Sequence, residues 1–155
     1  MQPIEIDGIV FRPYEHGSRD DMKGYILRCT AMNLFPIPDE SAVEFMYGSH
    51  ENEKNRIKLG AFLGNGMVGT VCLEPQSEHT SLLCQFAVAP KLQGKGIGRK
   101  LLAYTHAAAK ELGFTRIVLD ARQNAYEFYR KAGYIPTGEQ RVFPNLVLHK
   151  MYIDL

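Results

Sequence analysis

Apolar and polar residues form short blocks along the chain, separated by glycine- and proline-containing turns. Strands are predicted where the blocks are rich in β-branched and aromatic residues: one or two within 4–14, then 57–63, 67–73, 81–88, 115–119, 139–143 and 146–153. Helical spacing predicts helices over 18–34, 39–48, 97–112 and 124–132. This order predicts an α/β (α+β) fold, a mixed sheet with helices packed on it, in one domain over residues 1–155.

Local signals define several of these elements. Asn65-Gly66 between two apolar blocks indicates a hairpin. Ser18 is placed to cap the first helix, whose apolar face would comprise Met22, Ile26, Leu27, Thr30, Ala31 and Leu34. The helix over 97–112 has a clear apolar face and ends before Gly113, and His106 is expected on its exposed face. Residues 50–56 are polar and predict a loop.

Composition narrows the class of protein. The chain has 155 residues, 45% of them hydrophobic and 23% charged, with a net charge of +1, which gives no general attraction to nucleic acid or to a membrane surface. No stretch approaches the roughly 20 apolar residues of a membrane span, and the N-terminus does not have the pattern of a signal peptide. Three separated cysteines without a C-x-x-C pair indicate reduced thiols, no metal site and a cytoplasmic location.

Residues 86–102 carry the strongest chemical signal. An apolar strand ends at Pro90, glycines follow at 94, 96 and 98, and a helix begins. Four basic residues and no acid lie in this window: Lys91, Lys95, Arg99 and Lys100. Glycines let a backbone turn tightly, and the first N–H groups of a helix favour an anion. The window therefore predicts a phosphorylated ligand, with the pyrophosphate of coenzyme A favoured over an ordinary strand-turn-helix corner.

Two motifs in this order resemble those of the GNAT acetyltransferases. Residues 93–98 (Gln-Gly-Lys-Gly-Ile-Gly) resemble the family's Gln/Arg-x-x-Gly-x-Gly/Ala signature, after an Ala-Val-x-Pro strand end. Residues 124–134 resemble its second signature, Asn-…-Phe-Tyr-x-x-x-Gly-Phe/Tyr. The resemblance covers 57–155 well and the first fifty residues weakly. A nucleotide-binding domain for ATP or NAD is disfavoured, because the loop lacks the G-x-x-x-x-G-K-S/T spacing.

The resemblance implies a mostly antiparallel sheet of about six to seven strands, flanked by about four helices, with its fourth and fifth strands splayed. Acetyl-CoA would enter between the splayed strands, and no metal would be needed. The residues implied to bind it are Phe86, Ala87, Val88, Gln93, Gly94, Lys95, Gly96, Ile97, Gly98, Arg99, Asn124, Phe128 and Tyr129. Asn124 is also a candidate N-cap, and Phe128 and Tyr129 are also candidates for simple packing residues.

The resemblance also suggests catalytic roles. The Val88 N–H would stabilise the oxyanion, and Tyr129 would donate a proton to the departing thiolate. The general base is open: strand 81–88 carries no carboxylate where many relatives have a glutamate. His149 is a candidate because imidazole groups titrate near neutral pH and because 145–151 resembles a histidine-x-x-methionine ending in one bacterial subgroup. Glu139, a water relay and a purely structural histidine are the alternatives.

The leading hypothesis is an enzyme that transfers acetyl from acetyl-CoA to a primary amine by direct attack in a ternary complex. The alternative is a non-catalytic acyl-CoA-binding or regulatory module on the same fold. Residues 18–56 and 136–149 are expected to shape the acceptor site, for an amine on a small molecule, peptide or protein. The C-terminal strands could also pair across a homodimer.

Overall fold

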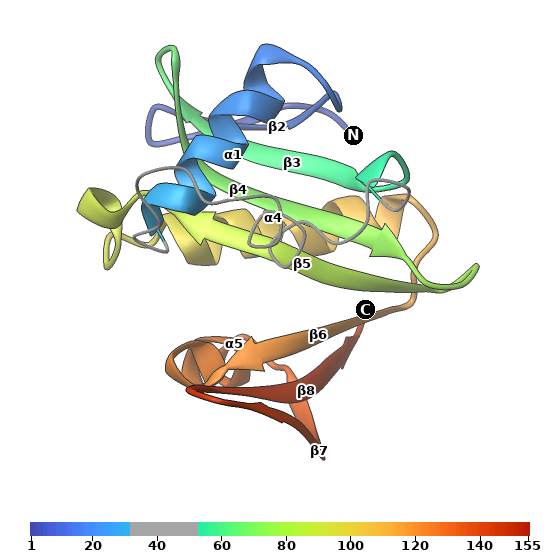
Figure 1. Cartoon of the computed structure of the whole chain (residues 1–155). Helices are drawn as coiled ribbons and strands as arrows, with labels where there is room; N and C mark the ends of the chain where they lie inside the picture. Colours follow the sequence, from blue (N-terminus) through green and yellow to red (C-terminus); the bar gives the residue numbers. More distant parts are fainter. Residues whose placement is uncertain (32–52) are drawn as a thin grey trace.

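The computed structural model describes residues 1–31 and 53–155. One sheet runs through them in the order β1-β2-β3-β4-β5-β6-β8-β7 (Figure 1). Its strands are β1 (Ile4–Ile6), β2 (Ile9–Tyr14), β3 (Ile57–Leu63), β4 (Gly66–Pro75), β5 (Thr80–Val88), β6 (Arg116–Arg122), β7 (Ile135–Phe143) and β8 (Leu146–Asp154). The described α-helices are α1 (Arg19–Ala31), α4 (Ile97–Glu111) and α5 (Tyr126–Lys131), with 3₁₀ turns η1 (Pro90–Leu92) and η2 (Gln123–Ala125).

The predicted mixed, mostly antiparallel sheet is confirmed, and β5–β6 is the parallel pair. The described sheet has eight strands, slightly more than expected, because a turn at Asp7-Gly8 divides the first block into β1 and β2. The predicted hairpin is confirmed as the β3–β4 connection, but its two-residue loop is Gly64-Asn65, because Gly66 already pairs with Leu63. The predicted helix over 39–48 lies outside the described residues, as do the end of the 18–34 helix and residues 50–52 of the predicted 50–56 loop.

Helix α1 begins as predicted but presents a different face. The Ser18 Oγ accepts the Asp21 N–H at 3.2 Å, as an N-cap does. The predicted apolar face is wrong in part, because Met22 is 59% and Ile26 46% exposed, whereas Leu27 is buried. Gly24 explains the difference. A Cβ there would lie 2.8 Å from the Tyr14 hydroxyl, so the face of α1 that carries Gly24 is the one that packs closely on the sheet.

Helix α4 contributes most of its apolar face to the core, as predicted: Ile97, Leu101, Leu102, Thr105, Ala108 and Ala109 are buried. Gly113 follows its end with a φ of 95°, as a C′ glycine does. The expectation for His106 is wrong, since its ring is half-buried and lies 2.8 Å from the Tyr134 hydroxyl. In Figure 1, α1 crosses one face of the sheet and α4 lies behind the other.

Strands β5 and β6 diverge, as the resemblance implied. Their register pairs only 80–82 with 116–118, and β5 then continues to Val88 and β6 to Arg122 without pairing to each other. Beyond the divergence, β6 pairs along its length with β8. Figure 1 shows the two strands separating, and we call the region between their diverging ends the wedge. In the described part of the chain, no helix is both long and apolar enough to cross a membrane.

Candidate active site

One edge of β5 faces the wedge with its backbone. The Ala89 N–H donates to the Val68 carbonyl of β4 at 2.8 Å. Because N–H groups alternate in direction along a strand, the neighbouring Val88 N–H points away from β4, into the wedge. The Val88 carbonyl, on the same side, accepts the Gln93 side-chain amide at 3.1 Å. The Val88 N–H is therefore oriented to donate to a ligand between β5 and β6.

A bulge in β5 precedes this edge. Gln85 has a φ of 56°, a left-handed conformation that is strained for a residue with a side chain, and the β4–β5 register shifts nearby. Its Oε1 accepts the Cys72 thiol at 3.2 Å. After the bulge, the Phe86 ring packs against Phe128 and Tyr129, with centroids 5.7 and 6.1 Å apart. Sequence reasoning missed this bulge, because glutamine is not a residue that signals positive φ.

The glycine turn has the conformation that its sequence predicts at two of three positions. Gly94 and Gly96 have φ values of 81° and 84°, which L-residues rarely adopt. Helix α4 begins directly after Gly96, and no side chain caps its first N–H groups. Gly98 is helical instead, and a Cβ there would lie 3.5 Å from Phe128 and 3.6 Å from Val88. The turn thus presents helix N–H donors beside the wedge.

The four basic residues of this turn differ in their partners. The Lys100 Nζ lies 2.8 Å from Asp7 Oδ2, at the turn between β1 and β2. Lys91, Lys95 and Arg99 are exposed and make no ion pair with any residue that the structure describes. These three cations are therefore the ones available to an anionic ligand.

Tyr129 lies at the wedge, on α5. Its side chain is 7% exposed and packs edge-on against Phe86, Phe128 and Tyr134. Burial, with a smaller contribution from Cys84, raises the pKa of Tyr129 well above its ordinary value, so the hydroxyl keeps its proton. Its hydroxyl has no hydrogen-bond partner within residues 1–31 and 53–155. The structure thus brings Phe86, Phe128 and Tyr129 together. The family resemblance assigned these residues to acetyl-CoA binding, a role that stays a prediction.

Asn124 lies close to this group in the chain but does not cap α5. It is exposed within η2, and the N-cap position is Ala125, with no side-chain cap. The capping prediction is therefore wrong, because a 3₁₀ turn separates Asn124 from the helix. The predicted contact with a cofactor stays a prediction.

His149 lies in a pocket of about 480 Å³ that contains neither Val88 nor Tyr129 in its lining. Its Nε2 is 2.6 Å from Gln123 Oε1, its Nδ1 is 3.4 Å from Gln140 Nε2, and its ring lies against Tyr126. Since Gln123 Oε1 can only accept, Nε2 carries the proton and Nδ1 is the basic nitrogen. Glu139, the other candidate base, lines the same pocket and pairs with Lys150 at 3.3 Å.

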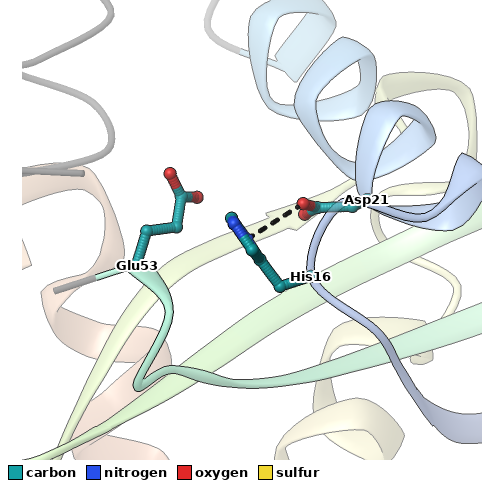
Figure 2. Close-up of side chains that lie close together, drawn as sticks. All are labelled: His16, Asp21 and Glu53. Atoms are coloured by element: carbon teal, nitrogen blue, oxygen red, sulfur yellow. Dashed lines mark ion pairs between the residues drawn. The ribbon is translucent and has the colours of Figure 1, made fainter. Parts of the chain in front are cut away.

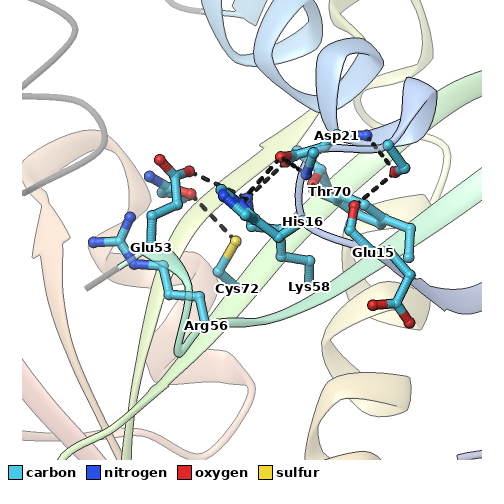
Figure 3. A network of polar contacts seen from close by, with 12 residues as sticks. Glu15, His16, Asp21, Glu53, Arg56, Lys58, Thr70 and Cys72 are labelled. Atoms are coloured by element: carbon cyan, nitrogen blue, oxygen red, sulfur yellow. Dashed lines mark hydrogen bonds and ion pairs between the residues drawn. The ribbon is translucent and has the colours of Figure 1, made fainter. Parts of the chain in front are cut away.

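A buried ionic cluster on the α1 side of the sheet was not foreseen. His16, Asp21 and Glu53 offer ligand atoms within 4.8 Å of one another, and Figure 2 shows their side chains converging. The Lys58 Nζ lies 2.6 Å from Asp21 Oδ1, 3.2 Å from Glu53 Oε1 and 3.2 Å from His16 Nδ1 (Figure 3). Its side chain is 1% exposed. The Lys58 ammonium supplies the positive charge that this set of groups requires.

The chain matches a family model described as the acetyltransferase (GNAT) family over residues 24–134. Similar solved structures include a GNAT family acetyltransferase from Elizabethkingia anophelis with acetyl-CoA bound (20% identity, covering 97% of this chain and 100% of that chain, TM-score 0.73). An IAA acetyltransferase from Bacillus cereus is 19% identical (95% and 99%, TM-score 0.69). An aminoglycoside 6'-N-acetyltransferase complexed with coenzyme A is also 19% identical (93% and 96%, TM-score 0.72). At these identities the structural likeness concerns the fold.

Proposed function

Because this chain belongs to the acetyltransferase (GNAT) family, we propose that it transfers the acetyl group of acetyl-CoA to a primary amine by direct attack in a ternary complex. One observation carries the proposal: the Val88 backbone faces the wedge directly before the glycine turn and the uncapped start of α4. Acetyl-CoA and coenzyme A in two similar structures support this choice of donor.

The proposed binding mode assigns each part of the donor to a described segment. The pantetheine arm would lie in the wedge and pair with backbone of 86–88, as an added strand does. The pyrophosphate would accept hydrogen bonds from the backbone N–H groups of 93–99 at the start of α4, where the helix dipole favours an anion. Lys91, Lys95 and Arg99 would add charge, while Asn124 and Phe128 would contact the pantetheine from η2 and α5.

Two groups at the wedge fit the chemistry of acetyl transfer. As an amine attacks the thioester, negative charge develops on the carbonyl oxygen, and the Val88 N–H would donate a hydrogen bond to it. When the C–S bond breaks, the Tyr129 hydroxyl would give its proton to the thiolate, whose conjugate acid has a pKa of about 8.5 as a free thiol. A tyrosine of ordinary pKa, about 10, already holds this proton at neutral pH. Burial raises the pKa of Tyr129 further, which makes its hydroxyl a weaker acid than that of an exposed tyrosine.

The structure constrains the general base, which takes the proton from the amine, less than it constrains the oxyanion donor and the acid. Strand β5 carries no carboxylate, so His149 Nδ1 is the group we propose, with Glu139 or a water relay as the alternatives. For this role, Nδ1 must exchange its 3.4 Å contact with Gln140 for the acceptor or for water. His149→Asn is expected to lower kcat/KM, because an amide cannot take up the amine's proton. An unchanged kcat/KM would assign the proton to another group.

The proposal is tested by thiol release from acetyl-CoA in the presence of an amine panel: spermidine, kanamycin, a lysine-containing peptide and free amino acids. Turnover with any of them supports transfer. Tight acetyl-CoA binding with no turnover across the panel would favour the non-catalytic module, which the absence of a carboxylate on β5 motivates. Failure of acetyl-CoA to bind at millimolar concentration would refute both.

Tyr129→Phe tests the acid. General acid catalysis typically contributes about 10²–10⁴-fold, and a thiolate needs less help than a poorer leaving group, so we expect kcat to fall about 100-fold. The KM for acetyl-CoA should change less than about twofold, because the ring remains. Tyr152→Phe on β8, where the ring lies under Arg116, is the matched control. Equal turnover in both variants would remove Tyr129 from the mechanism.

Location and assembly complete the proposal. Cys29, Cys72 and Cys84 are all free thiols, which agrees with a cytoplasmic protein. The acceptor would be an amine on a small molecule, peptide or protein. A homodimer through the C-terminal strands belongs to the same proposal, and sedimentation equilibrium would detect it.

A further inference from the structure

Tyr134 joins the element that carries Tyr129 to helix α4. It follows α5, its side chain is 2% exposed, and its N–H donates to the Tyr129 carbonyl at 3.0 Å. Its hydroxyl lies 2.8 Å from the His106 Nε2, on the half-buried side of α4. The His106 and Tyr134 rings also lie against each other, with centroids 5.5 Å apart. Tyr134 is therefore fixed at both its backbone and its hydroxyl.

The Tyr134 ring in turn packs against Tyr129. Their centroids are 5.5 Å apart and the planes meet at 73°, the edge-to-face geometry that aromatic pairs prefer. Phe86 and Phe128 contact Tyr129 with similar angles, but their side chains carry no group that could hydrogen-bond to a neighbouring element. Of the three rings around Tyr129, Tyr134 is thus the one held by a hydrogen bond to a separate helix.

This restraint matters because the Tyr129 hydroxyl makes no hydrogen bond to any described residue. The orientation of the ring therefore depends on packing, and proton transfer requires the hydroxyl to lie within hydrogen-bond reach of the acceptor atom. Burial lowers the pKa of His106, which favours the neutral imidazole as the partner of the Tyr134 hydroxyl.

We propose that His106 and Tyr134 are a positioning pair, which holds the Tyr129 ring in the orientation that proton donation to the thiolate requires. Neither residue needs to touch substrate, and both act through Tyr129. The inference rests on the proposed function, because it assigns a purpose to the orientation of the proposed acid.

Two substitutions remove the hydrogen bond and leave its surroundings nearly intact. Tyr134→Phe deletes only the hydroxyl, and His106→Leu deletes the partner. One net hydrogen bond corresponds to at most about a tenfold change in rate, so we expect kcat to fall about three- to tenfold in each variant. The KM for acetyl-CoA should stay within about twofold. His106→Gln, whose amide can reach the same hydroxyl, should restore most of kcat.

The decisive experiment is a double-mutant cycle, measured by thiol release with acetyl-CoA and the amine that gives the highest rate in the panel. In a Tyr129→Phe background, Tyr134→Phe should lower kcat no further, since the group it positions is gone. If Tyr134→Phe is as harmful there as in the wild type, the pair acts on stability alone and the inference is wrong. An unchanged kcat in the single variant also overturns it.

Failure of this inference and failure of the proposed function are distinguishable. If Tyr129→Phe is silent, the proposed acid is wrong. If Tyr129→Phe lowers kcat while Tyr134→Phe and His106→Leu do not, only the positioning pair is wrong. Thermal unfolding of each variant, in the absence of acetyl-CoA, confirms that every measured protein is folded at the assay temperature.

Discussion

Substitution of Lys58 by methionine is the perturbation whose effect follows most directly from the structure. The Lys58 ammonium contacts Asp21 and Glu53 at 2.6 and 3.2 Å, and the lysine side chain is 1% exposed. Methionine fills similar space but carries no charge. The variant would leave two carboxylates facing each other with no cation between them, in a site that water reaches poorly.

The magnitude follows from the burial of the partners. Removing one member of a buried ion pair costs about 3–5 kcal/mol, because the remaining charge is uncompensated. The Asp21 side chain retains 15% exposure and the neighbouring His16 side chain 42%, so water would offset part of the cost. We therefore expect a loss near the lower limit, about 3 kcal/mol. For a protein of this size, that corresponds to a fall in Tm of about 6–12 °C.

Urea unfolding followed by circular dichroism measures this free energy. Lys23→Met on α1 is the matched control, because its side chain is 42% exposed and its contacts with Asp20 and the Asn65 carbonyl should contribute no more than about 1 kcal/mol. Replacing the carboxylates together with the lysine (Asp21→Asn, Glu53→Gln, Lys58→Met) should recover part of the loss. If Lys58→Met and the Lys23 control unfold at the same urea concentration, the cluster does not stabilise the fold as described.

Three further predictions concern the glycine turn and the ionic cluster. Gly96→Ala should cost about 1–2 kcal/mol in urea unfolding and weaken acetyl-CoA binding in calorimetry, because φ is 84° there while the space around a Cβ is open. Lys95→Ala should weaken acetyl-CoA binding severalfold at low salt, whereas Lys100→Ala, which loses a surface ion pair, should not. Burial alone would raise the pKa of Asp21, but the Lys58 hydrogen bond and a backbone N–H bring it below 3.8. The resulting stabilisation is present above about pH 4 and is lost as pH falls through the folded pKa, so urea midpoints of Asp21→Asn should vary less between pH 5 and pH 2.

Elements defined by local signals were predictable from the sequence. The β3–β4 hairpin, Ser18 as N-cap and the tight glycine turn with positive φ at Gly94 and Gly96 depend on neighbouring residues, although the hairpin loop is Gly64-Asn65 rather than Asn65-Gly66. The family resemblance grouped Phe86, Phe128 and Tyr129 as binding residues, whereas the packing of Tyr134 against Tyr129 was not predicted.

Features set by distant segments were not predictable in the same way. The exposed side of α1 depends on the approach of Gly24 to Tyr14, which no helical periodicity reveals. The Lys58 cluster combines His16 and Asp21, near the start of α1, with Glu53. In the sequence, Lys58 is an isolated lysine in an apolar strand, and this pattern does not predict an ionic cluster. The contact between His106 and Tyr134 joins residues 28 positions apart, and the pattern of α4 alone placed His106 toward solvent.

A crystal structure with acetyl-CoA would show whether the wedge between β5 and β6 binds the acetyl donor. We expect the pantetheine between these strands, its thioester oxygen within hydrogen-bond distance of the Val88 N–H, and the pyrophosphate on the N–H groups of 93–99. Acetyl-CoA bound outside the wedge, for example in the pocket beside His149, would contradict the proposed binding mode.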